Sequence, residues 1–484
     1  MKEDSKKIKI SAIKAIFMVG GSKIFSLLSG LVRTKFIATM FGPGGIAIYG
    51  LIQQLTITAS VLTSLGISTA STQLIGKSNR AEKVELTKNF VALFVATNIS
   101  ILLTIITFFL FSELIISELF SSYEGTYLVL CLCLTTILII IFDSQMSVLQ
   151  GLRFVKEYSL ITILSSVIGT TIGIYLMFLF DKFALSYLLL IINFLGVFFA
   201  YLTLYHLDIP SLKFKNIYDF SYFLPSLKSL YILGLAVGAF FIFEQITFLW
   251  IRSYIEKTLG LEFLGYFQAA YILAVTYVGI ILSALSKDFL PSISAASEDP
   301  HQVYELISNQ IDLLITLTMP ALLIMVGFSS FIIELLFSSE FSQSKQLLSI
   351  MVIADIFKLV AFPIGFAILG LGDGAAFSRQ GPVQLLILIC LVYISIPLYG
   401  INAFGYIYIF TNLVGFLWSY FYLKRKIRYI LPRPLKNYLL IAISSILITY
   451  YLGLQLTMIS ISMIFGIVFL YSFYGFRKIR FLFS

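Results

Sequence analysis

Long apolar stretches, separated by short polar connections, follow one another along almost the whole chain. Each stretch has about 20 residues or more, which is enough for a helix to cross a hydrocarbon layer of ~30 Å. The stretches do not show the short apolar–polar alternation of membrane β-strands, and helices satisfy their own backbone hydrogen bonds in lipid. The pattern predicts an all-α polytopic membrane protein with 14 candidate spans, at 11–40, 46–75, 87–111, 126–150, 157–180, 183–205, 229–251, 263–289, 306–336, 346–370, 382–399, 402–423, 437–452 and 456–475.

Basic residues separate the two sides of this arrangement. The termini and the connections on their side hold 25 of the 33 lysines and arginines, whereas the other side holds 6. Because cytoplasmic connections are enriched in Lys and Arg, both termini are predicted to be cytoplasmic. The formal net charge of +9 is therefore mostly a topology signal, and it requires no nucleic-acid partner.

Composition supports the membrane class and argues against metal or cofactor chemistry. The chain is 59% hydrophobic and 12% charged, which is more apolar surface than a soluble chain of this length can enclose. Three cysteines fall inside predicted spans, at Cys131, Cys133 and Cys390, and the two histidines have no partner at a metal-binding spacing. No GxxxxGK[ST] motif for nucleotide phosphates is present. We therefore expect no cofactor and no metal ligand set.

A weak internal repeat divides the spans into two groups. The stretch FGPGGIAIYGLIQQL (41–55) opens the second span, and LGLEFLGYFQAAYIL (259–273) opens the eighth in the same way, with a glycine turn before an apolar helix that contains Gln. An even number of spans separates the copies, as in a parallel repeat of two bundles; glycine turns can also resemble one another by chance. The repeat predicts a six-helix lobe at 1–206, a cytoplasmic linker at 207–228, a second six-helix lobe at 229–425 and an extra helix pair at 426–484.

Ionisable residues inside the spans are the candidates for function, because they are costly in lipid unless they face a wet cavity or one another. Lys23, Ser26, Gly30 and Arg33 follow one helical stripe, which could line a cavity and admit an anion. For Arg33 the alternative is that its side chain reaches back to the outer headgroups. The full set is Lys23, Arg33, Lys35, Asp143, Glu244, Arg252, Asp312, Asp355 and Lys358.

Asp355 and Lys358 lie three residues apart in the stretch IADIFKLVAFP (353–363) and share one helix face. One interpretation is a self-neutralised pair without a function. The other is a cavity-facing site in which Lys358 binds an anionic headgroup and Asp355 carries a proton. Two apolar residues would stabilise the helix without a desolvation cost, which favours the functional interpretation.

Three stretches of this sequence resemble a known transporter family. FGPGGIAIYGLIQQL (41–55) resembles the first-loop signature of Wzx-type O-antigen and polysaccharide flippases. LGYFQAAYILAVTYVGIILSALSKDFLPSIS (264–294) resembles their eighth span, and FSQSKQLLSIMVIADIFKLVAFPIGFAI (341–368) resembles their tenth. Asp355 and Lys358 match the acid and lysine of that span, while Ala354 replaces its glycine. The resemblance covers spans 1–12, and the last helix pair departs from the usual 12-span form.

This resemblance implies the two-lobed fold of the multidrug/oligosaccharidyl-lipid/polysaccharide exporter superfamily, in the bacterial cytoplasmic membrane. It implies that the chain is not an enzyme. It also implies that the chain flips an undecaprenyl-pyrophosphate-linked glycan to the outer leaflet and contacts membrane lipid. A polysaccharide polymerase and chain-length proteins are the expected protein partners. Lys23, Arg33, Arg252 and Lys358 would neutralise the diphosphate. Asp143, Glu244 and Asp355 are candidates for coupling to a gradient of H+ or Na+.

Three other functions stay open at this point. A cationic-drug exporter of the same superfamily would favour a net acidic cavity, whereas bases outnumber acids here. A lipid II flippase also has a basic cavity, but the Asp355–Lys358 pair favours the Wzx type. A membrane glycosyltransferase or polymerase would need a large hydrophilic loop, and the longest connection between the predicted spans is 207–228.

Overall fold

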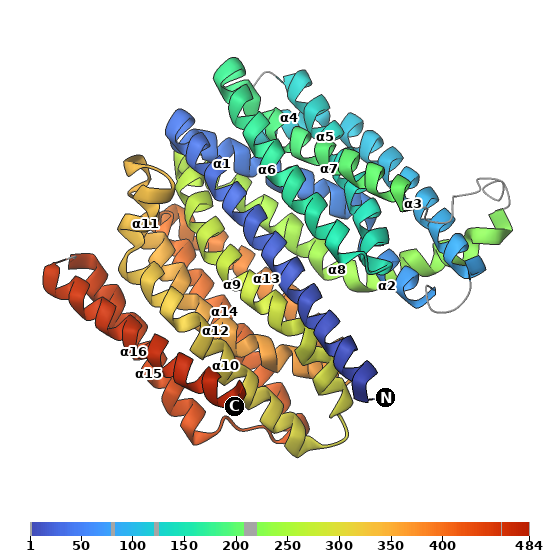
Figure 1. Cartoon of the computed structure of the whole chain (residues 1–484). Coiled ribbons are helices and arrows are strands. Elements are labelled where there is room, and N and C mark those ends of the chain that lie inside the picture. Colours follow the sequence, from blue (N-terminus) through green and yellow to red (C-terminus); the bar gives the residue numbers. More distant parts are fainter. Residues whose placement is uncertain (1, 79–82, 121–124, 208–219, 456, 484) are drawn as a thin grey trace. The chain divides into compact units, whose positions relative to one another are not determined.

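The computed structural model describes residues 2–78, 83–120, 125–207, 220–455 and 457–483, and all their regular elements are helices (Figure 1). This confirms the all-α class. Two compact units are distinguished: Met1–Phe41 with Ile48–Ser253, and Gly42–Ala47 with Tyr254–Ser484. The predicted lobes stay a prediction, since most of the 207–228 linker lies outside the described residues. The chain is a multi-pass membrane protein.

The first unit consists of α1 apart from residues 42–47, the elements from α2 to α7, and α8 as far as Ser253. Glycines allow close packing within it: Gly151 of α5 lies against Ile75 of α2. The elements are α1 (Lys2–Ser64), α2 (Ile67–Ser78), α3 (Lys83–Leu110), α4 (Ser112–Leu119), α5 (Gly125–Gly151), α6 (Val155–Phe180), the short 3-10 helix η1 (Asp181–Phe183), α7 (Ala184–His206) and α8 (Phe220–Leu259).

In the second unit α12 is the central helix, because it packs against α9, α10, α13 and α14 and most of its side chains are buried. The final pair, α15 and α16, packs on α10, where Gly453 lies against the backbone of Gly327. The elements are α9 (Leu261–Ala295), α10 (Pro300–Gly327), α11 (Ser329–Leu336), η3 (Ser339–Phe341), α12 (Ser344–Gly370), α13 (Gly374–Tyr399), α14 (Asn402–Ile427), α15 (Arg433–Gln455) and α16 (Met458–Phe483).

All 14 predicted spans lie on helices, but their number is not established. Among the described residues, nine helical segments are long and apolar enough to cross a membrane, or ten if the bent pair within α8 is one span. Two of these segments overlap two predicted spans each: Val155–His206 contains both of its spans, and Gly21–Ser64 covers parts of 11–40 and 46–75. The count of 14 therefore stays a prediction.

The glycine turns of the internal repeat have matching backbone conformations. Gly42 interrupts α1 with φ 62° and ψ −160°, and Gly260 precedes α9 with φ 103° and ψ 167°. Both conformations strongly favour glycine, and the two residues occupy the same place in the repeated stretches 41–55 and 259–273. The repeat is therefore present in local geometry as well as in sequence.

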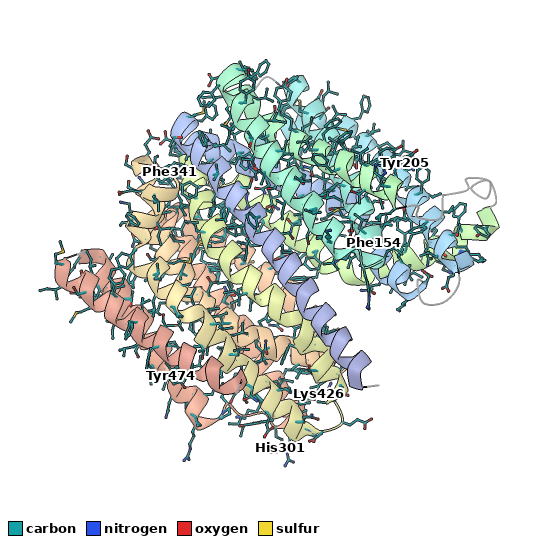
Figure 2. All side chains as sticks on the ribbon, in the orientation of Figure 1. Phe154, Tyr205, His301, Phe341, Lys426 and Tyr474 are labelled. Atoms are coloured by element: carbon teal, nitrogen blue, oxygen red, sulfur yellow. The ribbon has the colours of Figure 1, made fainter. Side chains whose placement is uncertain are left out.

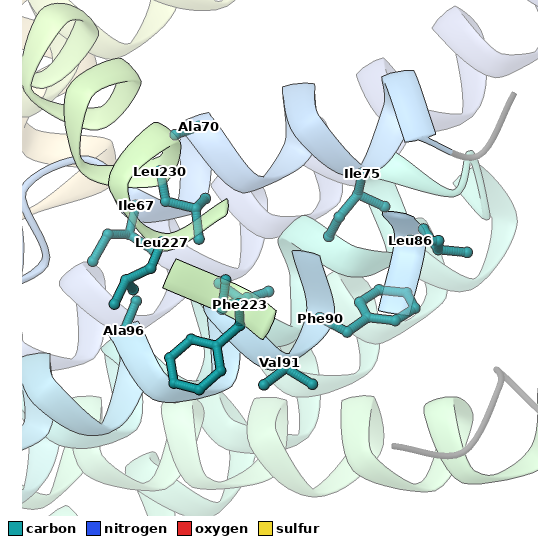
Figure 3. Packing of buried hydrophobic residues seen from close by; sticks show 12 residues of the cluster. Ile67, Ala70, Ile75, Leu86, Phe90, Val91, Ala96, Phe223, Leu227 and Leu230 are labelled. Atoms are coloured by element: carbon teal, nitrogen blue, oxygen red, sulfur yellow. The ribbon is translucent and has the colours of Figure 1, made fainter. Parts of the chain in front are cut away.

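Helix α1 ends at Ser64 and α2 begins at Ile67, so the second predicted span is broken. Leu65 (φ 49°) and Gly66 (φ 75°) form the break. A methyl group on Gly66 would lie 2.6 Å from the carbonyl oxygen of Gly234 on α8. Beyond the break, α2 packs against α3 and α8 through an apolar cluster that includes Ile67, Phe90 and Leu227 (Figure 3). The backbone contact between Gly66 and Gly234 and the apolar cluster around Ile67 thus fix the position of the break.

The turn between α12 and α13 is closed by a polar network centred on Asp373, which lies outside the predicted spans. Asp373 accepts a hydrogen bond from the backbone N–H of Ala376 (3.0 Å) and from the hydroxyl of Tyr422, and its Oδ2 lies 3.2 Å from Nζ of Lys426. Lys426 lies near the end of α14 (Figure 2). These donors, with the Tyr422 hydroxyl first, lower the pKa of Asp373 to about 2. Asp373 therefore ties the start of α13 to α14 while it is ionised.

Replacing Gly66 with alanine should destabilise the first unit by about 2–4 kcal/mol, because a side chain is strained at this φ and clashes with the Gly234 carbonyl. Thermal unfolding of the purified protein in detergent measures the effect. Gly466→Ala is the matched control, since its helical site is open. Equal melting temperatures for the two variants would contradict the close packing at the break.

Acidification should weaken the α13–α14 connection. Because the pKa of Asp373 is lowered to about 2 in the folded protein, its stabilising effect is complete above about pH 4 and is lost as the pH falls towards 2. The melting temperature of wild type should therefore fall further between pH 5 and pH 3 than that of Asp373→Asn, which keeps a capping side chain. Parallel pH curves for both proteins would contradict this role.

Candidate functional site

Asp143 lies on α5 of the first unit, where two adjoining cavities share its side chain. The larger cavity has a volume of ≈ 440 Å³. Apart from Met146, its lining is polar: Ser68, Thr69, Thr72, Gln73, Asp143, Ser147, Gln150 and Tyr158. Polar groups are costly within apolar helices unless they meet water, ions or a polar ligand. The arrangement therefore provides a wet, open space along one unit, and the exposed Asp143 is the one carboxyl residue among the described residues of its lining.

The smaller cavity has a volume of ≈ 10 Å³, which is close to the room that one water-sized particle needs. Its lining combines the Asp143 carboxyl group with hydroxyls from both sides of the α1–α2 break, from α3 and from α5. The residues are Ser60, Ser64, Ile67, Ser68, Thr97, Ser100, Ile140, Asp143 and Ser144. We call its six hydroxyl residues and Asp143 the hydroxyl cage.

Arg33 and its stripe on α1 lie against α6. Ser29 donates to the Thr170 hydroxyl (2.9 Å), and Nη1 of Arg33 lies 3.3 Å from the same hydroxyl. The guanidinium also lies over the ring of the buried Tyr49, 5.5 Å from its centre. Nε of Arg33 is enclosed and has no hydrogen-bond partner among the residues that the structure describes. Arg33 therefore retains one unused donor for an additional acceptor.

The other predicted residues of the first unit differ in burial. Lys23 is exposed and Glu244 is half-buried. Arg252 is buried, with its Nη1 3.1 Å from the Phe248 carbonyl oxygen of the same helix. Beside Glu244, Gln245 of α8 accepts a hydrogen bond from Gln54 of α1 (2.9 Å). The roles assigned to Lys23, Glu244 and Arg252 stay predictions.

Asp355 and Lys358 occupy the interior of the second unit. Asp355 on α12 has no exposed surface, and neither of its carboxyl oxygens has a hydrogen-bond partner among the described residues. Lys358, one turn later, interacts electrostatically with Asp355, with Tyr408 of α14 and with Tyr271 of α9. A buried carboxyl group without a partner is rare and costly. This site is therefore a candidate for binding a proton or a cation.

The predicted residues thus fall into two separate sets. Lys23, Arg33, Asp143, Glu244 and Arg252 belong to the first unit, and Asp355 and Lys358 belong to the second. Within the second unit, the sequence did not identify Tyr271, Tyr408 and Asn412, which come from other helices than α12. Tyr408 is nearly buried, and its carbonyl accepts a hydrogen bond from the Asn412 amide (2.8 Å).

Sequence reasoning also missed the hydroxyl cage, although the chain carries a signal for it. Ser60, Ser64, Ser68 and Thr72 recur every four residues, a spacing that would put them on one face of a continuous helix. Asp143 and Ser147 show the same spacing on α5. If the two spans are neighbours, these two polar stripes predict a polar cavity between them.

A sequence family described as polysaccharide biosynthesis protein matches this chain over residues 38–346, which is more than half of its length. Among curated proteins, none matches the chain. The family match begins at Ala38 and therefore includes both repeated stretches, 41–55 and 259–273, and the hydroxyl cage.

Solved membrane transporters share the fold at low sequence identity. A structure of lipid II flippase MurJ in an inward closed conformation is 17% identical, with a TM-score of 0.71, over 95% of this chain and 98% of that chain. An inward-facing multidrug resistance MATE family transporter of the MOP superfamily is 14% identical, with a TM-score of 0.66, over 85% and 96%. A MOP superfamily transporter from Pyrococcus furiosus is 17% identical, with a TM-score of 0.61, over 86% and 96%. The chain has the MOP superfamily fold.

Removing Lys358 alone should destabilise the second unit more than removing both charges. Lys358→Met leaves Asp355 buried without its compensating charge, which is expected to cost about 3–5 kcal/mol. Adding Asp355→Asn should recover a large part of that loss. Thermal unfolding of the two single variants and the double variant measures the coupling. Additive effects would contradict an energetic connection between the two residues.

Proposed function

Because the chain belongs to the polysaccharide biosynthesis protein family, we propose that it flips undecaprenyl-pyrophosphate-linked oligosaccharide repeat units. The family match is the observation that carries this proposal. The cargo would move from the cytoplasmic to the outer leaflet of the bacterial inner membrane, with both termini cytoplasmic. The sugars and the diphosphate cannot cross ~30 Å of hydrocarbon unaided, so the protein would shelter the polar head by alternating access.

The cationic side chains are consistent with a diphosphate cargo. Lys23, Arg33, Arg252 and Lys358 are the residues proposed to neutralise it. Arg33 supports this role because its enclosed Nε has no acceptor among the described residues, and guanidinium groups bind phosphate oxygens in a directional way. Movement of the cargo would require no covalent chemistry, so we propose a transporter and not an enzyme. A polysaccharide polymerase and chain-length proteins would act on the cargo afterwards.

We further propose that an ion gradient drives the cycle. Asp355 supports this best, because its buried carboxyl group has no hydrogen-bond partner among the described residues, and such a group gains strongly from a proton or a cation. Lys358 beside it would compensate the charge when the ion leaves. Asp143 and Glu244 are the proposed acids of the first unit.

The proposal predicts where cargo accumulates when the gene is deleted. The lipid-linked repeat unit should collect in the cytoplasmic leaflet, and wild type should restore surface glycan. Lys358→Ala should reduce restoration about tenfold or more, whereas Lys424→Ala, at an exposed lysine, should restore it fully. Leaflet-specific labelling of the lipid-linked glycan provides the measurement, and immunoblotting of membranes confirms equal protein amounts.

Two results would contradict the proposal. Accumulation of the repeat unit in the outer leaflet would place the chain after the flipping step. Normal surface glycan in a deletion strain that contains no second flippase would exclude this cargo. Full restoration by Lys358→Ala would leave the flippase intact and remove Lys358 from the pathway.

A further inference from the structure

The hydroxyl cage has the chemistry of a cation site rather than of an ordinary water site. The hydrogens of four of its hydroxyls are already used inside the protein. Ser60 donates to the Ile57 carbonyl, Ser100 to the Ala96 carbonyl and Thr97 to the Leu93 carbonyl, at 2.9, 2.9 and 2.8 Å. Thr97 and Ser144 lie 2.9 Å apart, and since Thr97 has used its hydrogen, Ser144 is the donor.

These bonds leave oxygen lone pairs as the free groups of those four residues. Hard metal cations bind carboxylate, hydroxyl and carbonyl oxygens. Among the described residues that line this cavity, Asp143 is the single ionisable one. One carboxylate balances one positive charge, whereas Ca2+ sites usually gather several carboxylates. The charge of the cage therefore fits a monovalent cation.

The helix break supplies a second, independent observation. Ser64 is the last residue of α1, and the end of a helix carries unpaired carbonyl groups and partial negative charge. In membrane transporters, interrupted helices expose such carbonyls to bound cations. Leu65 holds a left-handed conformation at this place without being glycine, and such strain is typical of functional sites.

The cage also has an entry path. Ser68 and Asp143 line both the cage and the ≈ 440 Å³ cavity. A hydrated ion could reach Asp143 through the larger space and lose its water at the hydroxyl oxygens. The cage, with a volume of ≈ 10 Å³, has room for the bare ion but not for an organic cation, which could approach the exposed Asp143 from the larger cavity.

We propose that the hydroxyl cage binds one monovalent metal cation of the size of Na+, with Asp143 as its charged ligand and the hydroxyl oxygens as neutral ligands. This deepens the ion-coupling part of the proposed function on which it rests. Binding of the ion itself does not depend on the identity of the cargo.

Radioactive Na+ binding to the full chain, purified in nanodiscs and kept at constant ionic strength with choline chloride, tests the site. Wild type should bind Na+ saturably, and excess unlabelled Na+ should displace it. Asp143→Asn should weaken binding about tenfold or more. Asp181→Asn should bind like wild type, because Asp181 is exposed in the same unit and outside both cavities.

The hydroxyl ligands are tested with a pair of variants on α3. Thr97→Val keeps the shape of the side chain and removes one oxygen ligand, so it should weaken Na+ binding several-fold. Thr107→Val is the matched control, since Thr107 is half-buried like Thr97, also bonds to its own helix and lies outside both cavities. Effects of equal size in both variants would argue against coordination by the cage.

Three outcomes would overturn the inference. The first is that wild type shows no saturable Na+ binding. The second is that Asp143→Asn binds Na+ as tightly as wild type does. The third is that Asp355→Asn alone abolishes Na+ binding. The Na+ binding experiment and the surface-glycan assay can fail independently of each other. A chain that binds Na+ through Asp143 but does not restore surface glycan would keep the cation site and reject the flippase.

Discussion

The structure depends on one constraint, the high free energy of an unsatisfied polar group inside apolar helices. Backbone groups satisfy one another within each helix. Many Ser and Thr side chains do the same by donating to a carbonyl one turn earlier, as Thr104 and Thr318 do. Against this background, two of the places that keep unused polar capacity among the described residues involve acids. One is the Asp355 carboxyl group, and the other is the set of oxygen lone pairs around Asp143.

Hydrophobic periodicity was sufficient to predict most of the fold. It gave helices at all 14 expected spans, and the glycine turns of the repeat were located by sequence alone. Gly42 and Gly260 confirm that choice, because both hold backbone conformations that strongly favour glycine. What periodicity could not give is the break at Leu65–Gly66. The flanking residues are apolar or hydroxylated and continue a helical pattern, so the break follows from contact with Gly234 of α8, a residue far along the chain.

The candidate site was predictable where charge made it visible. Asp143, Asp355 and Lys358 are conspicuous in apolar stretches, and the structure encloses Asp355 completely. Their neighbours were not predictable, because Tyr271 and Tyr408 are two of 28 tyrosines and only packing against α12 selects them. The stripe of Lys23, Ser26 and Arg33 was expected to line a cavity, yet Ser26 and Arg33 bond to Ser166 and Thr170 of α6. A stripe pattern identifies a shared face but does not identify what that face contacts.

The two acids differ in a way that bears on coupling. An ion drives a conformational cycle only if it binds one state more tightly than another. At Asp355 all neighbours belong to packed helices, so the binding strength depends on how α9, α12 and α14 approach one another. At Asp143 the ligands come from both sides of a helix break. The positions of Ser64 and Ser68 relative to Asp143 change when the torsions of Leu65 and Gly66 change, even if each helix stays rigid.

The proposed cation would hold the break in one geometry. Since Ser68 and Thr72 of α2 also line the larger cavity, that geometry sets the shape of the space next to it. A bound ion and a polar ligand in that cavity would therefore influence each other through α2, without direct contact between them.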